Sequence, residues 1–195
     1  MFNGIIYRTG KVKYIKKGYK SIYIGIKTNI NFNRKDIGAS VSCNGVCLTI
    51  EKISKNLIFF YISNETLKRS NFKNVKLNQI INIEKPLVYG SGISGHFTQG
   101  HVDSVAKIKK ITIIDKTWLI SFQILNKSLN KFLLEKASIS INGVSLTISK
   151  VYKNFFEINV IPHTLKLTNL SKLNVNSLVN VELDIVSKYI YKYSN

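Results

Sequence analysis

The strongest constraint on this chain is an internal duplication. Residues 40–50 read SVSCNGVCLTI and residues 138–148 read SISINGVSLTI, so eight of the eleven positions are identical. Further matches follow at the same spacing, and Gly4 matches Gly100 at a slightly shorter one. A spacing held along the whole chain indicates two copies of one domain. We therefore predict domains at residues 1–89 and 98–184, followed by a separate C-terminal segment at residues 185–195.

Most of each half consists of short runs rich in β-branched and aromatic residues, which are typical of β-strands. Asn44-Gly45 and Asn142-Gly143 each separate two such runs, and Asn-Gly favours a tight hairpin because both residues accept positive φ. Five or six short strands per half predict a closed or nearly closed antiparallel barrel. The expected strands are Val12–Ile15, Ile22–Ile26, Ser40–Ile53, Leu57–Ile62, Ile80–Glu84, Val105–Ile108, Leu119–Ile124, Ser138–Val151, Phe155–Ile161 and Leu178–Leu183.

Helices are expected only at the corners and at the end of the chain. Short helices should follow Asn64 and Pro162, and Ser128–Glu135 should form another with Ser128 as its N-cap. The glycine-rich segment Pro86–Gly95 is the expected linker. The final segment, Ile185–Tyr193, has apolar residues at helical spacing, so it is either a helix that packs on another subunit or a frayed tail.

The composition limits the classes of function. No apolar run approaches the roughly 20 residues of a membrane span, and the N-terminus lacks a secretory pattern, so we expect a soluble cytoplasmic protein without membrane partners. The net charge of +19 comes mainly from lysines spread along the chain, which favours a solvated basic surface over a nucleic-acid-binding face. Cys43 and Cys47 are too few for a disulfide framework or a zinc site, so no metal is expected.

Small polar residues in the two hairpins are the first candidates for chemistry. Cys47 and Thr49 correspond to Ser145 and Thr147, and residues two apart on a strand point to the same side. Taken alone, this alternation favours a structural role in a half-buried strand. We also expect Gly4-Ile5-Ile6 and Gly100-His101-Val102 to open the first strand of each half, where glycine lets a ligand approach the backbone.

Three histidines are the natural acid–base groups, because imidazole titrates near neutral pH. His101 is the best placed of them, directly after Gly100. His96 lies in the linker and His163 follows Pro162, so both are weaker candidates. The chain has no glycine-rich phosphate loop, HExxH motif or serine nucleophile elbow.

Several motifs resemble the riboflavin synthase family along the whole chain and in the right order. These are the opening Met1–Ile6, the block at residues 40–49, the run Ser94–Asp103 and the Ser145–Thr147 block. The resemblance implies a mainly β fold of two tandem six-stranded antiparallel Greek-key barrels plus a C-terminal helix. It implies a transferase that dismutates two molecules of 6,7-dimethyl-8-ribityllumazine to riboflavin and 5-amino-6-(ribitylamino)uracil. It also implies a cofactor-free cytoplasmic homotrimer, whose sites are shared between neighbouring subunits, with lumazine synthase as a further partner.

The resemblance also implies particular site residues. For catalysis it points to Cys47, His101, Ser145 and Thr147, with Ser40 and Phe2 in support. The first-half pocket would use Gly4, Ile5, Ile6, Cys47, Leu48, Thr49, Tyr61, Ile62, Ser63, Asn64, Glu65 and Thr66. The second-half pocket would use Gly100, His101, Val102, Lys136, Ser145, Leu146, Thr147, Asn159, Val160, Ile161, Pro162, His163 and Thr164.

Duplication suits a reaction between two copies of one substrate, because it supplies two similar pockets and can hold the two molecules close together. The halves must still differ, and Cys47 against Ser145 and Ile5 against His101 are such differences. Two departures from the family pattern stand out: Asn142 replaces a common Asp, which would remove a charge near the pocket, and His163 stands where the first half has Glu65.

Two other functions remain open. A lumazine- or flavin-binding antenna protein would share the barrels, but such relatives tend to lose pocket groups in one half, and both halves keep theirs here. A single-stranded nucleic-acid binder would need aromatic and basic residues interleaved on one sheet face, and the sequence shows no such stripe. Enzymatic turnover therefore remains the favoured prediction.

Overall fold

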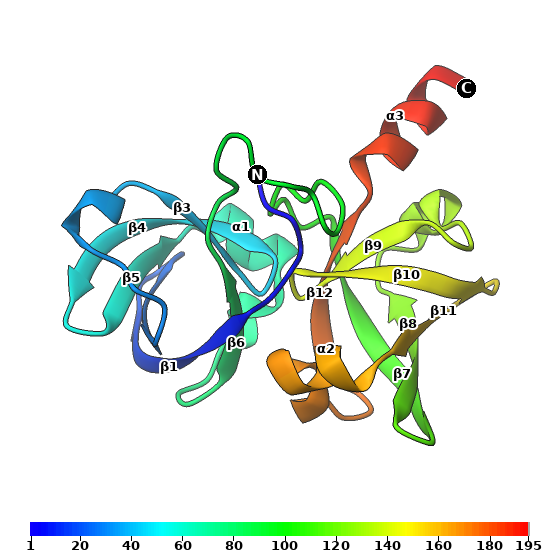
Figure 1. Ribbon diagram of the computed structural model, residues 1–195, viewed down its shortest axis with the longest axis horizontal. Helices are drawn as coiled ribbons and strands as arrows, with labels where there is room; N and C mark the ends of the chain where they lie inside the picture. The colour runs from blue at the N-terminus through cyan, green and yellow to red at the C-terminus, as the bar shows by residue number, and fades with distance from the viewer. Residues whose placement is uncertain (195) are drawn as a thin grey trace.

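The computed structural model describes residues 1–194, which form two closed six-stranded antiparallel barrels side by side (Figure 1). In barrel 1 the strand order is β1-β2-β5-β4-β3-β6, and β6 pairs with β1 to close the sheet. The strands are β1 (Arg8–Lys17), β2 (Ile22–Thr28), β3 (Ser40–Cys43), β4 (Val46–Ser54), β5 (Leu57–Ile62) and β6 (Ile80–Glu84).

Barrel 2 repeats the plan in the order β10-β11-β8-β7-β12-β9. Its strands are β7 (Ser104–Ile114), β8 (Thr117–Ile124), β9 (Ser138–Ile141), β10 (Val144–Val151), β11 (Phe156–Val160) and β12 (Leu178–Leu183). The predicted fold class is therefore confirmed. Strands β1 and β7 are longer than the predicted strands Val12–Ile15 and Val105–Ile108. Their additional residues, many of them polar, also pair with β2 and β8.

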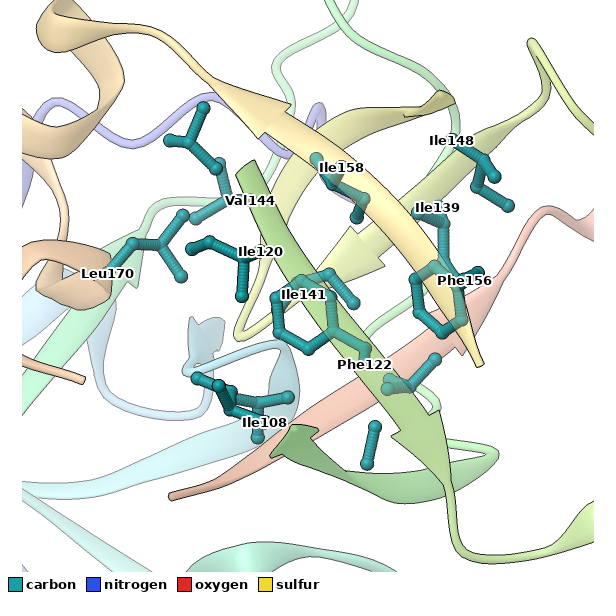
Figure 2. Close-up of a cluster of buried hydrophobic side chains, with 14 of the residues drawn as sticks. Ile108, Ile120, Phe122, Ile139, Ile141, Val144, Ile148, Phe156, Ile158 and Leu170 are labelled. Carbon is teal, nitrogen blue, oxygen red and sulfur yellow. The ribbon is translucent and has the colours of Figure 1, made fainter. Parts of the chain in front are cut away.

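Each barrel encloses its own core of β-branched and aromatic side chains. Figure 2 shows the core of barrel 2, in which Phe122 and Phe156 stack with ring centroids 5.5 Å apart among Ile108, Ile141 and Ile158. Successive strand residues alternate between this interior and the outside of the barrel. That alternation leaves the outer faces of the hairpins free to carry polar groups.

The helices lie where they were expected, with one correction. Helices α1 (Asn64–Arg69) and α2 (Pro162–Leu167) turn the corners after β5 and β11. The segment expected to be a helix from Ser128 is instead the 3-10 helix η3 (Lys127–Phe132), and its N-cap is Asn126, whose side chain accepts from the Ser128 N–H. The other 3-10 helices are η1 (Arg34–Asp36), η2 (Asn71–Asn74) and η4 (Asn169–Lys172).

The C-terminal segment forms helix α3 (Ile185–Ser194), which projects away from barrel 2 (Figure 1). Lys188 joins it to the barrel through an ion pair with Asp103, with Nζ and Oδ2 2.6 Å apart. Within residues 1–194 no helix is both long and apolar enough to cross a membrane.

The two barrels exchange the segments that precede their first strands. Residues 1–6 leave barrel 1 and pack on barrel 2, where the Gly4 carbonyl accepts from the Ser145 N–H at 2.8 Å. Residues 98–102 do the reverse, and the Gly100 carbonyl accepts from the Cys47 N–H at 2.8 Å. As a result, Ile6 belongs to the core of barrel 2 and Val102 to the core of barrel 1. These segments do not open β1 and β7, so that prediction was wrong.

Buried asparagines join the barrels across an approximate twofold axis. The Asn44 and Asn142 side chains accept from the N–H groups of Asn82 and Asn180, at 2.8 and 2.9 Å. The Asn82 and Asn180 amides then cross over and donate to the carbonyls of Asn142 and Asn44. Asn142 is 1% exposed within this network. It therefore bears on the interface between the barrels and not on a pocket charge, because an ionised Asp there would be costly to bury.

Candidate functional site

The polar residues of each hairpin share the outer face of their barrel. In barrel 1, Ser40 is paired with Thr49 and Ser42 with Cys47. The alternate pairs, Val41 with Leu48 and Cys43 with Val46, belong to the core. The register of β9 and β10 pairs Ser138 with Thr147 and Ser140 with Ser145 in the same way. Four small polar side chains therefore line up on each hairpin, as the two-residue spacing predicted.

Barrel 1 has a cavity of about 250 Å³ beside this face. Its lining combines Cys47 of β4, one side of helix α1 and the exchanged segment that carries His101. His101 is exposed and Cys47 is half-buried. Cys43, by contrast, is fully buried, and burial raises the pKa of its thiol, so it is an inert part of the core. The lining residues are Val46, Cys47, Glu65, Thr66, Arg69, Ser70, Gly100, His101 and Val102.

The corresponding place in barrel 2 is built around Ser145. The Gly4 backbone lies against it so closely that a Cβ added to Gly4 would stand 2.7 Å from the Ser145 Cβ. The linker also reaches this point, and His96 Nδ1 lies 2.7 Å from the Ser145 Oγ. His96 is 8% exposed, and burial lowers the pKa of its imidazole although Asp184 acts to raise it.

The predicted division of residues between the two pockets needs a correction. Gly4, Ile5 and Ile6 were expected beside Cys47, but the exchange places Gly4 on Ser145 and buries Ile6 in barrel 2. Gly100, His101 and Val102 were expected beside Ser145, and they line the Cys47 cavity instead. Each segment contains a glycine, Gly4 or Gly100, that packs closely on a hairpin in the same way. The local sequence therefore does not indicate which hairpin each segment contacts.

Two glutamates, the half-buried Glu84 and the buried Glu182, hold the exchanged segments in place. The Glu84 carboxylate accepts from the Asn3 and Gly4 N–H groups at 2.7 and 3.1 Å. Glu182 accepts from the Gln99 and Gly100 N–H groups at 2.6 and 2.9 Å. Burial raises the pKa of Glu84 to about 7, against the lowering effect of the N–H donors, and raises the pKa of Glu182 for the same reason. Each barrel thus supplies the carboxylate that anchors the segment lining the other barrel's site.

The helix corners differ between the barrels. Ser63 caps α1 by accepting from the Thr66 N–H, and its hydroxyl lies 3.1 Å from the Thr66 Oγ1. Its counterpart Ile161 cannot make this cap, and Pro162 begins α2 instead. Glu65 pairs with Arg69 at the rim of the barrel 1 cavity, whereas its counterpart His163 is exposed.

The remaining predicted residues fall into two groups. Lys136 is exposed, and its N–H donates to the Ile148 carbonyl at the base of the β9–β10 hairpin. Tyr61, Asn64, Asn159 and Thr164 are half-buried or exposed near the corners. Other side chains are buried, so they can offer a ligand only their backbone; these are Phe2, Leu48, Ile62 and Val160. Leu146 is partly buried against the core of barrel 2.

Sequence reasoning missed three residues. Glu84 and Glu182 carried a signal, since a glutamate repeated at the end of a β-strand in both halves is unusual in a barrel wall. His96 was ranked low because linker residues usually lie free in solvent. Only its burial against Ser145 in the folded chain brings it into the site.

The comparisons with known proteins agree with this architecture. A model of the lumazine binding domain matches the chain twice, at residues 3–86 and 99–184. The chain is 35% identical to the riboflavin synthase of Photobacterium leiognathi, covering 98% of this chain and 88% of that protein. It is 33% identical to the riboflavin synthase of Bacillus subtilis, covering 99% and 89% of the two chains.

The solved structures that resemble this one include LumP in complex with flavin mononucleotide. That structure superposes with a TM-score of 0.81 at 26% identity, over 94% of this chain and 99% of the other. LumP in complex with 6,7-dimethyl-8-(1'-D-ribityl)lumazine gives a TM-score of 0.81 at 27% identity, over 93% and 98% of the two chains. With its two lumazine-binding domains, the chain belongs to the riboflavin synthase family.

Proposed function

We propose that the protein is a riboflavin synthase. It transfers a four-carbon unit from one 6,7-dimethyl-8-ribityllumazine to a second, which yields riboflavin and 5-amino-6-(ribitylamino)uracil. The observation that carries this proposal is that both hairpins keep a polar outer face, with Cys47 and Thr49 on one and Ser145 and Thr147 on the other. Two equipped sites are what a reaction between two copies of one substrate needs.

The chain's own residues supply positioning and hydrogen bonds. Backbone groups at the exchanged segments and at the helix corners would bind the pyrimidinedione ring, and serine and threonine hydroxyls would bind the ribityl chain. Holding two reactants in one orientation contributes up to about 7–11 kcal/mol to a bimolecular reaction. For acid–base steps we assign His101 beside Cys47 in one site and Ser145 in the other, with Thr147 and Ser40 on the same outer faces.

Assembly into a trimer is part of the proposal. Helix α3 exposes a stripe of Val186, Tyr189, Ile190 and Tyr193, and Val186 and Ile190 are 56% and 62% exposed. An exposed apolar helix face of this kind is typical of a surface that a second copy covers. Packing of α3 helices about a common axis would bring barrel 1 of one subunit to barrel 2 of the next, and the two substrate molecules would meet there. We also propose that the protein is cytoplasmic and associates with lumazine synthase.

The alternative is a lumazine- or flavin-binding protein without turnover. The solved structures of LumP hold such ligands, but the relatives at 33–35% identity are named riboflavin synthase, which favours the enzyme. The test is to incubate the purified protein with 6,7-dimethyl-8-ribityllumazine and a chelator, and to follow riboflavin by absorbance. Riboflavin at about half the moles of lumazine consumed is expected from the proposed stoichiometry. If lumazine binds and stays unchanged, the proposed enzyme activity is wrong and the protein is a lumazine-binding protein.

A further inference from the structure

The contact between His96 and Ser145 distinguishes the two sites. His96 lies in the linker, and its neighbour Gly95 is packed so tightly that an added Cβ would stand 3.0 Å from the Ser145 Oγ. The His96 N–H donates to the Asn3 carbonyl at 3.3 Å, so the linker is fixed to the exchanged segment as well. The imidazole is therefore held beside the Ser145 hydroxyl by backbone contacts on both sides.

The unpaired ring nitrogen indicates which way the hydrogen bond runs. His96 Nε2 is fully buried and has no hydrogen-bond partner among residues 1–194. A buried N–H without an acceptor is rare, whereas a bare ring nitrogen leaves only a lone pair unsatisfied. The hydrogen of the neutral ring therefore belongs on Nδ1, where it can donate to the Ser145 Oγ.

Ser145 then has one group left to offer. Its backbone N–H already donates to the Gly4 carbonyl, and its oxygen accepts from His96. The hydroxyl hydrogen points elsewhere, as a donor. Asn3 Oδ1 is a second buried polar atom without a partner in residues 1–194, and it belongs to the segment that touches both His96 and Ser145. His96 and Asn3 thus each carry a buried polar atom without a partner, and such atoms call for an explanation, for which a bound polar ligand is one.

Barrel 1 has no equivalent arrangement. Its counterpart of Ser145 is Cys47, and the Cys47 thiol makes no hydrogen bond within the described residues. A thiol is also a weak donor compared with a hydroxyl. The two sites thus present different groups to two copies of the same molecule.

We propose that His96 is a positioning residue for Ser145: its Nδ1–H fixes the serine oxygen, so that the hydroxyl donates to an acceptor atom of the bound heterocycle in barrel 2. For the identity of that heterocycle, 6,7-dimethyl-8-ribityllumazine, this inference rests on the proposed function. The consequence is that the barrel 2 site binds its lumazine through an oriented donor, which is strongest where negative charge develops on the ring. In the barrel 1 site the thiol of Cys47 stands in place of this hydroxyl.

Three substitutions test the contact. His96→Asn keeps a donor near the position of Nδ1, His96→Gln places it near Nε2, and His96→Leu removes it. We expect His96→Leu and His96→Gln to lower the rate of riboflavin formation by up to about a hundredfold, the scale of a misplaced reactive group. His96→Asn should recover part of the loss. Ile93→Ala, an exposed change in the same linker, serves as the control.

A double-mutant cycle separates positioning from folding. If His96 acts through Ser145, His96→Leu should lower the rate and the lumazine affinity of wild type but change neither in a Ser145→Ala background. Equal losses in both backgrounds would overturn the proposal, as would a His96→Asn variant no better than His96→Leu. The melting temperature of each variant shows whether it is folded.

The ring itself can be observed without turnover. The chain has only three histidines, so ¹⁵N spectra of wild type, assigned with His101→Gln and His163→Gln, identify the His96 nitrogens. We expect Nδ1 to carry the hydrogen at neutral pH, and a hydrogen on Nε2 alone would overturn the proposal. If wild type makes no riboflavin, the proposed function fails. This spectrum, and the lumazine affinities of the four proteins of the double-mutant cycle, still decide the role of His96.

Discussion

At the scale of single residues, the sites depend on backbone approach distances that only glycine allows. Gly100 has φ +78, and a Cβ added there would stand 2.6 Å from the Cys47 Cβ. The left-handed conformation alone costs other residues about 1–3 kcal/mol. The exchanged segments are therefore sensitive to the smallest side chain that could be added.

Gly100→Ala should push the segment off Cys47. We expect a loss of at least about 1–3 kcal/mol in the free energy of unfolding, together with weaker lumazine binding to barrel 1. Gly92→Ala is the matched control, because Gly92 lies in the same region with nothing within 4 Å of its Cβ position. Urea denaturation and lumazine titration of both variants are the measurements, and equal behaviour of the two would contradict the close approach.

Glu84 makes stability depend on pH in a defined direction. Its pKa is about 7 in the folded protein against an ordinary value of 4.5. Because the folded state binds the proton more tightly, its contribution to stability is complete below about pH 4.5 and is lost as the pH rises through about 7. The free energy of unfolding of wild type relative to Glu84→Gln should therefore fall across this interval and level off above it. Urea denaturation at closely spaced pH values checks this, with the exposed Glu65→Gln as control, and a rise across the interval would contradict it.

At the scale of elements, the exchanged segments and the asparagine network make the two barrels one folding unit. Equivalent asparagines in the two halves make different numbers of hydrogen bonds in this network, although the halves are related by duplication. The Asn169 side chain donates to the Asn44 Oδ1 and the Ile80 carbonyl and accepts from Asn82. Within residues 1–194 the side chain of its counterpart Asn71 makes one hydrogen bond, to the Leu178 carbonyl.

Asn169→Ala should therefore cost more than Asn71→Ala. Each buried bond contributes about 1 kcal/mol and each partner left unsatisfied costs about 1–3 kcal/mol, so we expect about 2–4 kcal/mol for the first and about 1 kcal/mol for the second. Denaturant unfolding of the two variants is the comparison. Equal losses would mean that the network is symmetric in energy as well as in sequence.

At the scale of the whole molecule, oligomerisation and folding should be separable. Helix α3 contacts the rest of the chain through few residues, chiefly the Lys188–Asp103 ion pair and the packing of Tyr191 on Phe132. The barrel cores contain no residue of α3. The helix therefore contributes little to the folding of either barrel.

Truncation after Asp184 should abolish the proposed trimer and leave folded single chains. Size-exclusion chromatography with light scattering gives the mass, and circular dichroism reports the barrels. Ile190→Glu should have the same effect because it places a charge on the exposed apolar stripe, whereas Lys192→Glu, a charge change outside that stripe, should not. A trimer that survives both the truncation and Ile190→Glu would place the assembly surface elsewhere.

The sequence alone determined the features that follow from local periodicity. The repeat predicted two domains, the alternation of apolar and polar residues predicted strands, and the Asn-Gly pairs predicted the hairpin turns. The same alternation placed Cys47 with Thr49, and Ser145 with Thr147, on outer faces. Apart from the repeat, which is read by comparing the two halves of the sequence, these features depend on residues a few positions apart, whose relative directions are fixed by the backbone of a strand.

Only the tertiary structure decided how the two halves meet. Gly4 and Gly100 could each dock on either hairpin, because both hairpins offer the same N–H at the same place. The choice depends on chain path, on the Glu84 and Glu182 anchors, and on the fit of Ile6 and Val102 into the opposite cores. These contacts join residues about a hundred positions apart, so their energies leave no local pattern. For the same reason, the linker residue His96 became part of a site only when the folded chain buried it against Ser145.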